Sequence, residues 1–199
     1  MNVIRFFDVL FSLIGLIILL PVFLIIALLI KLSSKGPVFF KQDRVGKDGK
    51  DFKVYKFRSM HQYADKKGLL TVGGKDKRVT KIGYYLRKFK IDELPQLLNV
   101  ASGEMSIVGP RPEVRKYVAM YSAQQLRVLN VLPGITDHAS IQYRNENDLL
   151  ALSVDPEELY VREIMPRKID LNFRYVDNRS AGEYFKIILK TVITSVRGR

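Results

Sequence analysis

A long uncharged segment near the N-terminus constrains this chain more than any other feature of its sequence. Residues 9–30, VLFSLIGLIILLPVFLIIALLI, contain no Asp, Glu, Lys or Arg over 22 positions. A straight helix of that length rises about 33 Å, which is enough to cross the hydrocarbon core of a bilayer. The run is longer than the apolar part of a secretory signal, and no small-residue cleavage site follows it. The segment therefore predicts a membrane anchor.

A proline near the middle of the segment leaves two topologies open. Pro21 follows Leu20, lacks an amide hydrogen and clashes with the preceding turn, so a kink is expected at this pair. Positive residues flank both ends, with Arg5 before the segment and Lys31 and Lys35 after it. Such flanking suits a re-entrant helix with both ends on one face of the membrane. Spanning helices also tolerate proline, so these features alone do not choose between the two topologies.

Composition limits the chemistry of the remaining residues. The 199 residues include no cysteine, which excludes disulfides, thiolate zinc sites and cysteine nucleophiles. The two histidines, His61 and His138, are far apart and lack the spacing of a metal motif. A formal net charge of +13 favours anionic partners, which include phosphorylated substrates, acidic lipids and nucleic acid.

After residue 35 the sequence is typical of one globular domain without repeats or a low-complexity linker. The stretch GPVFFKQDRVGKDGKDFKVYKF predicts two short strands around a turn at 46–49. Its basic and aromatic residues, Lys56 among them, suit either a half-buried strand or contacts with a nucleotide. Helix start signals occur at Asp155 and Ser180. The apolar stripe after Ser180 suits either core packing or a membrane interface.

Two adjacent carboxylates occur in LRKFKIDELPQLLNV, residues 86–100. Asp92 fits the N-cap of a helix whose first turn contains Pro95. The helix dipole and the preceding cations favour the ionised forms, so Asp92 and Glu93 are both expected to be charged at neutral pH. Neighbouring helical positions diverge by about 100°, so the pair would not share one proton. One carboxylate can attack phosphorus while the other holds magnesium, or both can simply complement the helix dipole.

Two arginine-bearing loops lie downstream of the carboxylates. Residues 103–113, GEMSIVGPRPE, predict a short strand followed by Arg111 between two prolines. The prolines hold this arginine in an extended, rigid loop, which suits bidentate binding of phosphate. Residues 132–145, LPGITDHASIQYRN, predict a second turn at the Pro-Gly pair, with Arg144 beyond it. Either arginine alone would more often be a surface cation.

Taken in order, these segments resemble the bacterial sugar transferase family, the small monotopic phosphoglycosyl transferases. The matching pieces are the proline-containing apolar segment, GPVFFKQDRVG, FKVYKFRSM, IDELPQLLNV, GEMSIVGPRPE and LPGIT. The resemblance implies a mixed α+β, helix-rich fold. It places a re-entrant membrane helix in residues 1–35, bent at Leu20 and Pro21. Residues 36–199 would form a catalytic domain with short strands and interfacial amphipathic helices.

The resemblance also implies a reaction. A sugar 1-phosphate is transferred from a UDP-sugar to undecaprenyl phosphate with release of UMP, as the first membrane step of bacterial glycoconjugate synthesis. Asp92 would be the nucleophile that forms a covalent phosphosugar intermediate, and Glu93 would be a ligand of Mg²⁺. The implied phosphate-binding residues are Arg87, Arg111, Lys56 and Arg144.

The expected setting is the bacterial inner membrane, with the catalytic domain on its cytoplasmic face and in contact with membrane lipids. A homodimer and downstream glycosyltransferases are the candidate protein partners, and no nucleic acid is expected. A competing hypothesis is a membrane-anchored basic module that binds nucleic acid or acidic lipid without catalysis. It gives no reason for two carboxylates among cations. Another is a phosphotransferase that works in one step, without a covalent intermediate.

Two departures from the family pattern affect this comparison. The family often continues PGIT with Gly-Trp, whereas Asp137 and His138 stand here, which affects the shape of the pocket and the choice of sugar. The family often has an aspartate four residues after the serine that matches Ser180, but this chain has Tyr184 there. Glu183 is better explained as part of a helix cap than as a metal ligand.

Overall fold

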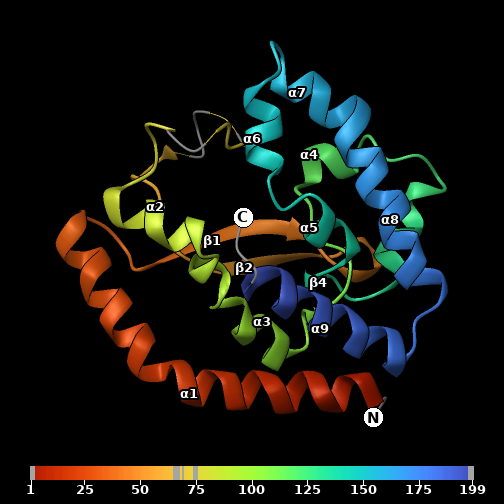
Figure 1. Ribbon diagram of the computed structural model, residues 1–199, viewed down its shortest axis with the longest axis horizontal. Helices are drawn as coiled ribbons and strands as arrows, with labels where there is room; N and C mark the ends of the chain where they lie inside the picture. The colour runs from red at the N-terminus through yellow and green to blue at the C-terminus, as the bar shows by residue number, and fades with distance from the viewer. Residues whose placement is uncertain (1–2, 65–67, 69, 74–75, 197–199) are drawn as a thin grey trace.

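Helices dominate the computed structural model, which describes residues 3–64, 68, 70–73 and 76–196. Within that part of the chain, the strands form two small sheets of two strands each. The helices are α1 (Val3–Ser33), α2 (Lys81–Lys88), α3 (Gln96–Ser102), α4 (Arg115–Val118), α5 (His138–Gln142), α6 (Glu146–Ala151), α7 (Pro156–Leu159), α8 (Met165–Asp177) and α9 (Ala181–Val196). The predicted mixed, helix-rich fold is confirmed (Figure 1).

The predicted hairpin is present. β1 (Phe39–Val45) pairs antiparallel with β2 (Asp51–Phe57), and a short 3₁₀ turn at Lys47–Gly49 joins them. Aromatic rings pair at its open end, where Phe39 stacks on Phe57 with ring centroids 5.4 Å apart. Such cross-strand pairs stabilise a two-stranded sheet that has no third strand. The hairpin carries Lys56 toward the carboxylate pair.

The second sheet corrects one prediction. β3 (Ser106–Val108) is the strand expected before Arg111, and it pairs in parallel with β4 (Gly134–Thr136). The predicted turn at Pro133 and Gly134 is wrong, because Gly134 opens β4. A Cβ atom on Gly134 would lie 2.1 Å from the amide nitrogen of Gly109, so a side chain cannot fit between these two segments. The glycine is explained by this close approach rather than by a turn.

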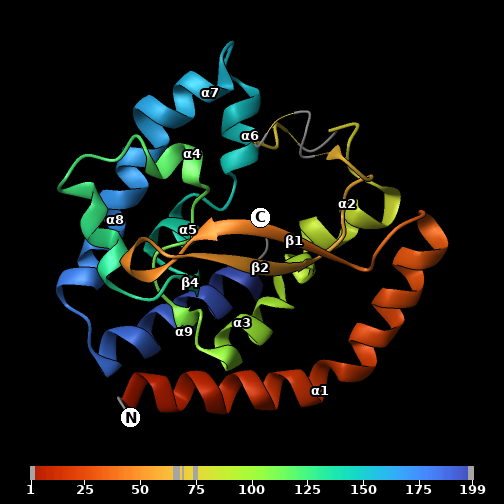
Figure 2. The same cartoon turned by 180° about the vertical axis from the view of Figure 1, so that it is seen from behind.

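The apolar segment forms one bent helix. Figures 1 and 2 show α1 running beneath α9 and α3 and then turning up beside α2. Pro21 lies inside it, and a sharp bend in a helix with an internal proline is attributed to the missing hydrogen bond. By length and composition α1 is able to cross a membrane, and only 17% of its most apolar window is buried inside the protein. These features fit membrane association.

The N-terminal arm of α1 is fastened to the globular domain by two charged residues. Arg5 donates to two carbonyl oxygens at the C-terminal end of α3, at 2.6 and 3.0 Å. Asp8 is 1% exposed, and its Oδ1 accepts from the hydroxyl groups of Ser106 and Tyr184 and from the amide of Ile107, all within 3.0 Å. No motif in the sequence indicated this role for Asp8.

The C-terminal end of α1 is fastened to the same domain. Arg58, 5% exposed at the end of β2, donates to the carbonyl oxygens of Ser34 and Lys35, each at 2.7 Å. A guanidinium suits this place because it lies just past the C-terminal end of α1, where the helix dipole carries partial negative charge. Both ends of α1 therefore contact one domain.

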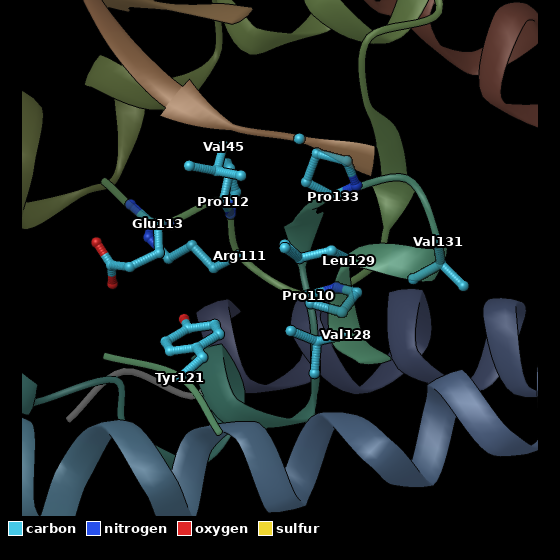
Figure 3. A pocket seen from close by; sticks show the side chains of 11 residues that line it. Val45, Pro110, Arg111, Pro112, Glu113, Tyr121, Val128, Leu129, Val131 and Pro133 are labelled. Carbon is cyan, nitrogen blue, oxygen red and sulfur yellow. The ribbon is translucent and has the colours of Figure 1, made fainter. Parts of the chain in front are cut away.

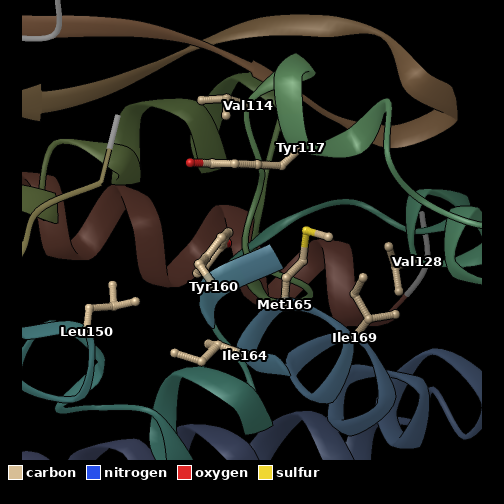
Figure 4. Packing of buried hydrophobic residues seen from close by; sticks show 8 residues of the cluster. All are labelled: Val114, Tyr117, Val128, Leu150, Tyr160, Ile164, Met165 and Ile169. Atoms are coloured by element: carbon tan, nitrogen blue, oxygen red, sulfur yellow. The ribbon is translucent and has the colours of Figure 1, made fainter. Parts of the chain in front are cut away.

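Two hydrophobic clusters build the C-terminal part of the domain. The larger one joins α4, α6 and α8 with the turns between them, and Figure 4 shows its members Val114, Tyr117, Val128, Leu150, Tyr160, Ile164, Met165 and Ile169. The smaller one buries Tyr184 and Ile187 of α9 against Ile4 of α1. Core packing thus explains one face of α9. The opposite face exposes Phe185, Leu189, Val192 and Ile193, and its contact with a membrane interface stays a prediction.

The helix start signals are confirmed. Asp155 accepts from the amides of Glu157 and Glu158, and Ser180 accepts from the amide of Glu183. The Glu183 carboxylate bonds the imidazole of His138 at 3.0 Å and the ammonium group of Lys186 at 3.2 Å.

Candidate active site

The carboxylate pair lies in a tight turn between α2 and α3. Residues Ile91–Glu93 form a 3₁₀ turn, and α3 begins only at Gln96, after Pro95. The predicted N-cap role of Asp92 is therefore wrong. Lys90, at the start of the turn, has a left-handed φ of 58°, which folds the chain back so that Asp92 points inward and is 5% exposed. A left-handed lysine is unfavourable, and such strain is often found at functional sites.

Glu93 is held by two cations from different parts of the fold. Nη1 of Arg111 donates to Oε2 at 2.9 Å, while Nη2 bonds Oε1, so the guanidinium is bidentate. Nζ of Lys56 on β2 lies 2.9 Å from the same Oε1. Burial acts to raise the pKa of Glu93, but Arg111 and Lys56 outweigh it and hold that pKa well below its usual range. This environment agrees with the expectation that Glu93 is ionised.

Asp92 has a different environment. Burial, reinforced by the negative charge of Glu93, raises the pKa of Asp92 to about 6, against the opposing effect of Lys56, Arg87 and Lys90. The predicted depression of this pKa by a helix dipole and cations is wrong, because desolvation dominates. Asp92 is still mostly ionised at pH 7. Its buried Oδ1 has no hydrogen-bond partner among the described residues.

The structure brings three of the predicted residues into contact, namely Lys56, Glu93 and Arg111. Arg87, in the last turn of α2, influences Asp92 electrostatically and donates to Oγ1 of Thr71 at 2.8 Å. Arg144 has another partner, since its guanidinium bonds the carbonyl oxygen of Thr194 in α9. The phosphate-binding roles of all four cations stay predictions.

Sequence reasoning missed two residues that hold the Arg111 loop. Arg44 on β1 donates to the carbonyl oxygen of Pro112 at 3.1 Å and to Oε1 of Glu113 at 3.0 Å. Oδ2 of Asp137 accepts from the backbone amide of Arg111 at 2.9 Å. Arg44 lies within the QDRVG motif and Asp137 directly follows PGIT, so both positions could have been noted as candidates. Their contacts with the Arg111 loop could not be predicted, because these partners are far away in sequence.

A pocket adjoins the far side of Arg111 (Figure 3). It encloses about 270 Å³, including space open to solvent. Arg111, Glu113 and Tyr121 line it together with apolar residues. The apolar lining residues include Val45, Val128, Leu129, Val131 and Pro133. Arg111 therefore lines this pocket and also bonds Glu93.

The carboxylate pair fits a magnesium ion only in company with a substrate. The described residues contain no group of three His, Asp or Glu side chains able to hold a metal, and both oxygens of Glu93 already bond cations. Mg²⁺ is commonly held by one or two carboxylates, waters and substrate phosphates. The unpartnered Oδ1 of Asp92 beside Glu93 suits that arrangement, with a diphosphate completing the site.

Comparison with known proteins identifies the family. The model of the bacterial sugar transferase family matches residues 1–198. The chain belongs to the bacterial sugar transferase family. A relative from Aeromonas hydrophila, a UDP-N-acetylgalactosamine-undecaprenyl-phosphate N-acetylgalactosaminephosphotransferase, is 37% identical over 98% of this chain and 44% of its own length. A UDP-glucose:undecaprenyl-phosphate glucose-1-phosphate transferase from Escherichia coli K12 is 40% identical over 93% of this chain and 38% of its own length.

A shorter member of the bacterial sugar transferase family matches a larger share of its own length. The putative undecaprenyl-phosphate N-acetylgalactosaminyl 1-phosphate transferase of Bacillus subtilis is 46% identical over 66% of this chain and 70% of its own length. The chain thus spans about two fifths of the Aeromonas and Escherichia relatives but most of this Bacillus one. Family membership is confirmed, and these names point to one class of reaction.

Proposed function

We propose that this family member transfers a sugar 1-phosphate from a UDP-sugar to undecaprenyl phosphate. The relatives that align with almost the whole chain are named for such transfers. The observation that carries the proposal is a buried Asp92 beside a Glu93 held by Arg111 and Lys56. A basic module that only binds acidic lipid or nucleic acid has no use for this arrangement.

The proposed chemistry has two steps. A carboxylate oxygen of Asp92 bonds to the phosphorus that bears the sugar, the bond from that phosphorus to the bridging oxygen breaks, and UMP leaves. A phosphate oxygen of undecaprenyl phosphate then attacks the same phosphorus, and the Asp92 carboxylate is released. Arg111 and Lys56 lie where they can neutralise charge on the diphosphate oxygens as it redistributes. Glu93 would hold Mg²⁺, which supplies further neutralisation of the diphosphate when bound.

The first test is release of UMP from a panel of UDP-sugars by the purified chain. In the two-step reaction, one of these donors yields UMP even without undecaprenyl phosphate, up to about one UMP per chain. A chain that releases UMP only when the acceptor is present uses a one-step transfer instead. A chain that releases no UMP from any donor with both Mg²⁺ and acceptor present does not have the proposed function.

We further propose a re-entrant anchor with the catalytic domain on the cytoplasmic face of the inner membrane. Arg5 and Asp8 fasten one end of α1, and Arg58 fastens the other end, to the same domain. A helix that crossed the bilayer would separate its ends by about 30 Å of hydrocarbon, so contacts of both ends with one domain support the re-entrant alternative. The homodimer and the contact with downstream glycosyltransferases stay predictions.

Single cysteines test this topology cleanly because the chain has none of its own. Val3→Cys and Lys35→Cys place a thiol at each end of α1, at side chains that are both exposed. We expect a membrane-impermeant maleimide to label both variants from the same side of sealed vesicles. Labelling of the two positions from opposite sides would contradict the re-entrant anchor.

The rate of donor cleavage is expected to fall in mild acid. Because burial raises the pKa of Asp92 to about 6, the nucleophile becomes protonated as the pH drops below that value. The rate of UMP release without acceptor should fall about tenfold for each pH unit below 6 and should level off above about pH 7. Omission of the acceptor matters, because a phosphate monoester itself titrates near pH 6. A rate that stays constant from about pH 5 to 8 would exclude Asp92 as the titrating nucleophile.

A further inference from the structure

The backbone at Arg111 has an unusual shortage of hydrogen-bond donors. Pro110 and Pro112 have no amide hydrogen, so the N–H of Arg111 is the single backbone donor of this tripeptide. That N–H donates to Oδ2 of Asp137 at 2.9 Å. The tripeptide's carbonyl groups are held elsewhere, since Pro110 accepts from the amide of Gly134 and Pro112 accepts from Arg44. Asp137 thus provides the acceptor for the backbone N–H of Arg111.

The Asp137 carboxylate is buried and joins three parts of the fold. It is 1% exposed. Its Oδ1 caps α5 by accepting from the amide of Ser140, and its Oδ2 also accepts from Nδ2 of Asn172 on α8 at 3.0 Å. A buried carboxylate is costly unless it is both hydrogen-bonded and compensated by positive charge. Glu93 most strongly, and Asp137 in addition, raise the pKa of Arg111, so the arginine is the compensating cation.

Capping of α5 does not by itself require this residue. Ser, Asn and Asp are comparable N-caps, but serine has a single side-chain oxygen, whereas Asp137 uses one oxygen for the amide of Ser140 and the other for that of Arg111. The family pattern often has glycine after PGIT, and glycine has no side chain to bind the arginine backbone. The aspartate is therefore explained by what it holds on the Arg111 side.

We propose that Asp137 is a positioning residue for Arg111 in the transfer reaction. It fixes the Arg111 backbone so that the guanidinium remains aligned with Glu93 and meets the donor diphosphate without reorganisation. The inference rests on the proposed function. Displacement of a charge-stabilising group by about 1 Å can cost roughly a hundredfold in rate, so a contact this close to the arginine affects catalysis directly.

Asp137→Ser tests the role because it keeps a cap for α5 and removes the acceptor for Arg111. The measurement is steady-state UMP release with undecaprenyl phosphate present, as a function of donor concentration, together with thermal unfolding. We expect kcat/KM for the donor to fall roughly tenfold to a hundredfold. Asn172→Ala is the matched control, since it removes another bond to the same Oδ2 and leaves the Arg111 amide in place. It should retain kcat/KM within about threefold of the parent.

A double-mutant cycle separates positioning from a merely structural effect. In an Arg111→Lys background, Asp137→Ser should lower kcat/KM for the donor by less than about a further threefold. The bidentate guanidinium that Asp137 positions is already absent in that background. Equal losses in both backgrounds would overturn the proposal, as would unchanged kcat/KM in Asp137→Ser or an equal loss in Asn172→Ala. If Asp137→Ser does not fold, Asp137→Asn serves, because its amide oxygen still caps α5 while its NH₂ group faces the Arg111 amide.

The outcome for the parent chain distinguishes this inference from the function on which it rests. A parent chain that releases no UMP from any donor overturns the proposed function and the role of Asp137 together. An active parent with an equally active Asp137→Ser overturns the role of Asp137 alone.

Discussion

Asp92→Asn is expected to lower UMP release by about a thousandfold or more, the scale seen when a catalytic nucleophile is removed. The amide keeps the shape of the side chain but has no anionic oxygen to attack phosphorus. Release of UMP from the donor found by the panel, measured with and without undecaprenyl phosphate, should fall in both assays. Membrane association should be unchanged, because α1 and its contacts with the domain are not altered.

The same variant should not lose stability. Burial raises the pKa of Asp92 from 3.8 to about 6, so the folded state binds this proton more tightly than the unfolded state does. Folding stability therefore falls as the pH rises through that interval, and above it the charge works against the fold. A neutral Asn should raise the free energy of unfolding at pH 7.5 by up to about 2 kcal/mol. Full activity in this variant would contradict the assigned role, and a lower free energy of unfolding would contradict the expected effect on stability.

Glu93→Gln is expected to have the next largest effect, about a hundredfold or more on UMP release. Its effect on stability should be opposite to that of Asp92→Asn. The charge that pairs with Arg111 and Lys56 disappears, and these cations become uncompensated in a mostly buried site. A loss of about 2 kcal/mol is expected, less than for a fully buried pair because the Arg111 side chain is 33% exposed.

The dependence on magnesium tests the role of Glu93 as a ligand. UMP release by Glu93→Gln should need a Mg²⁺ concentration at least about tenfold higher than the parent needs for half of its maximal rate. For the free energy of unfolding of Glu93→Gln, the matched control is Asp92→Asn, since it too replaces one carboxylate by an amide, at the adjacent position. If Glu93→Gln reached half of its maximal rate at the same Mg²⁺ concentration as the parent, Glu93 would be excluded as a metal ligand, even if the rate were low.

Features set by local sequence were predictable. An uninterrupted apolar run identifies α1, and aromatic and β-branched residues around a glycine-containing turn identify the hairpin of β1 and β2. The short strand before Arg111 and the caps at Asp155 and Ser180 also follow from neighbouring residues. In each case the interactions that decide the structure lie within a few positions of one another.

Features set by distant contacts were not predictable. The position of Asp92 depends on the left-handed φ of Lys90, which a lysine rarely adopts, so the pattern suggested an ordinary helix start. The pKa of Asp92 depends on burial that only the assembled fold creates. Asp8 and Asp137 likewise find partners 98 and 26 residues away, at Ser106 and Arg111.

Mass spectrometry of the intact chain after incubation with the donor alone tests the covalent step most directly. The proposed chemistry predicts a mass increase of one sugar phosphate, located by fragmentation on Asp92, in step with the release of UMP and lost on addition of undecaprenyl phosphate. No increase should occur in Asp92→Asn. Sustained turnover without any such adduct on Asp92, or an adduct on another side chain, would contradict the covalent intermediate.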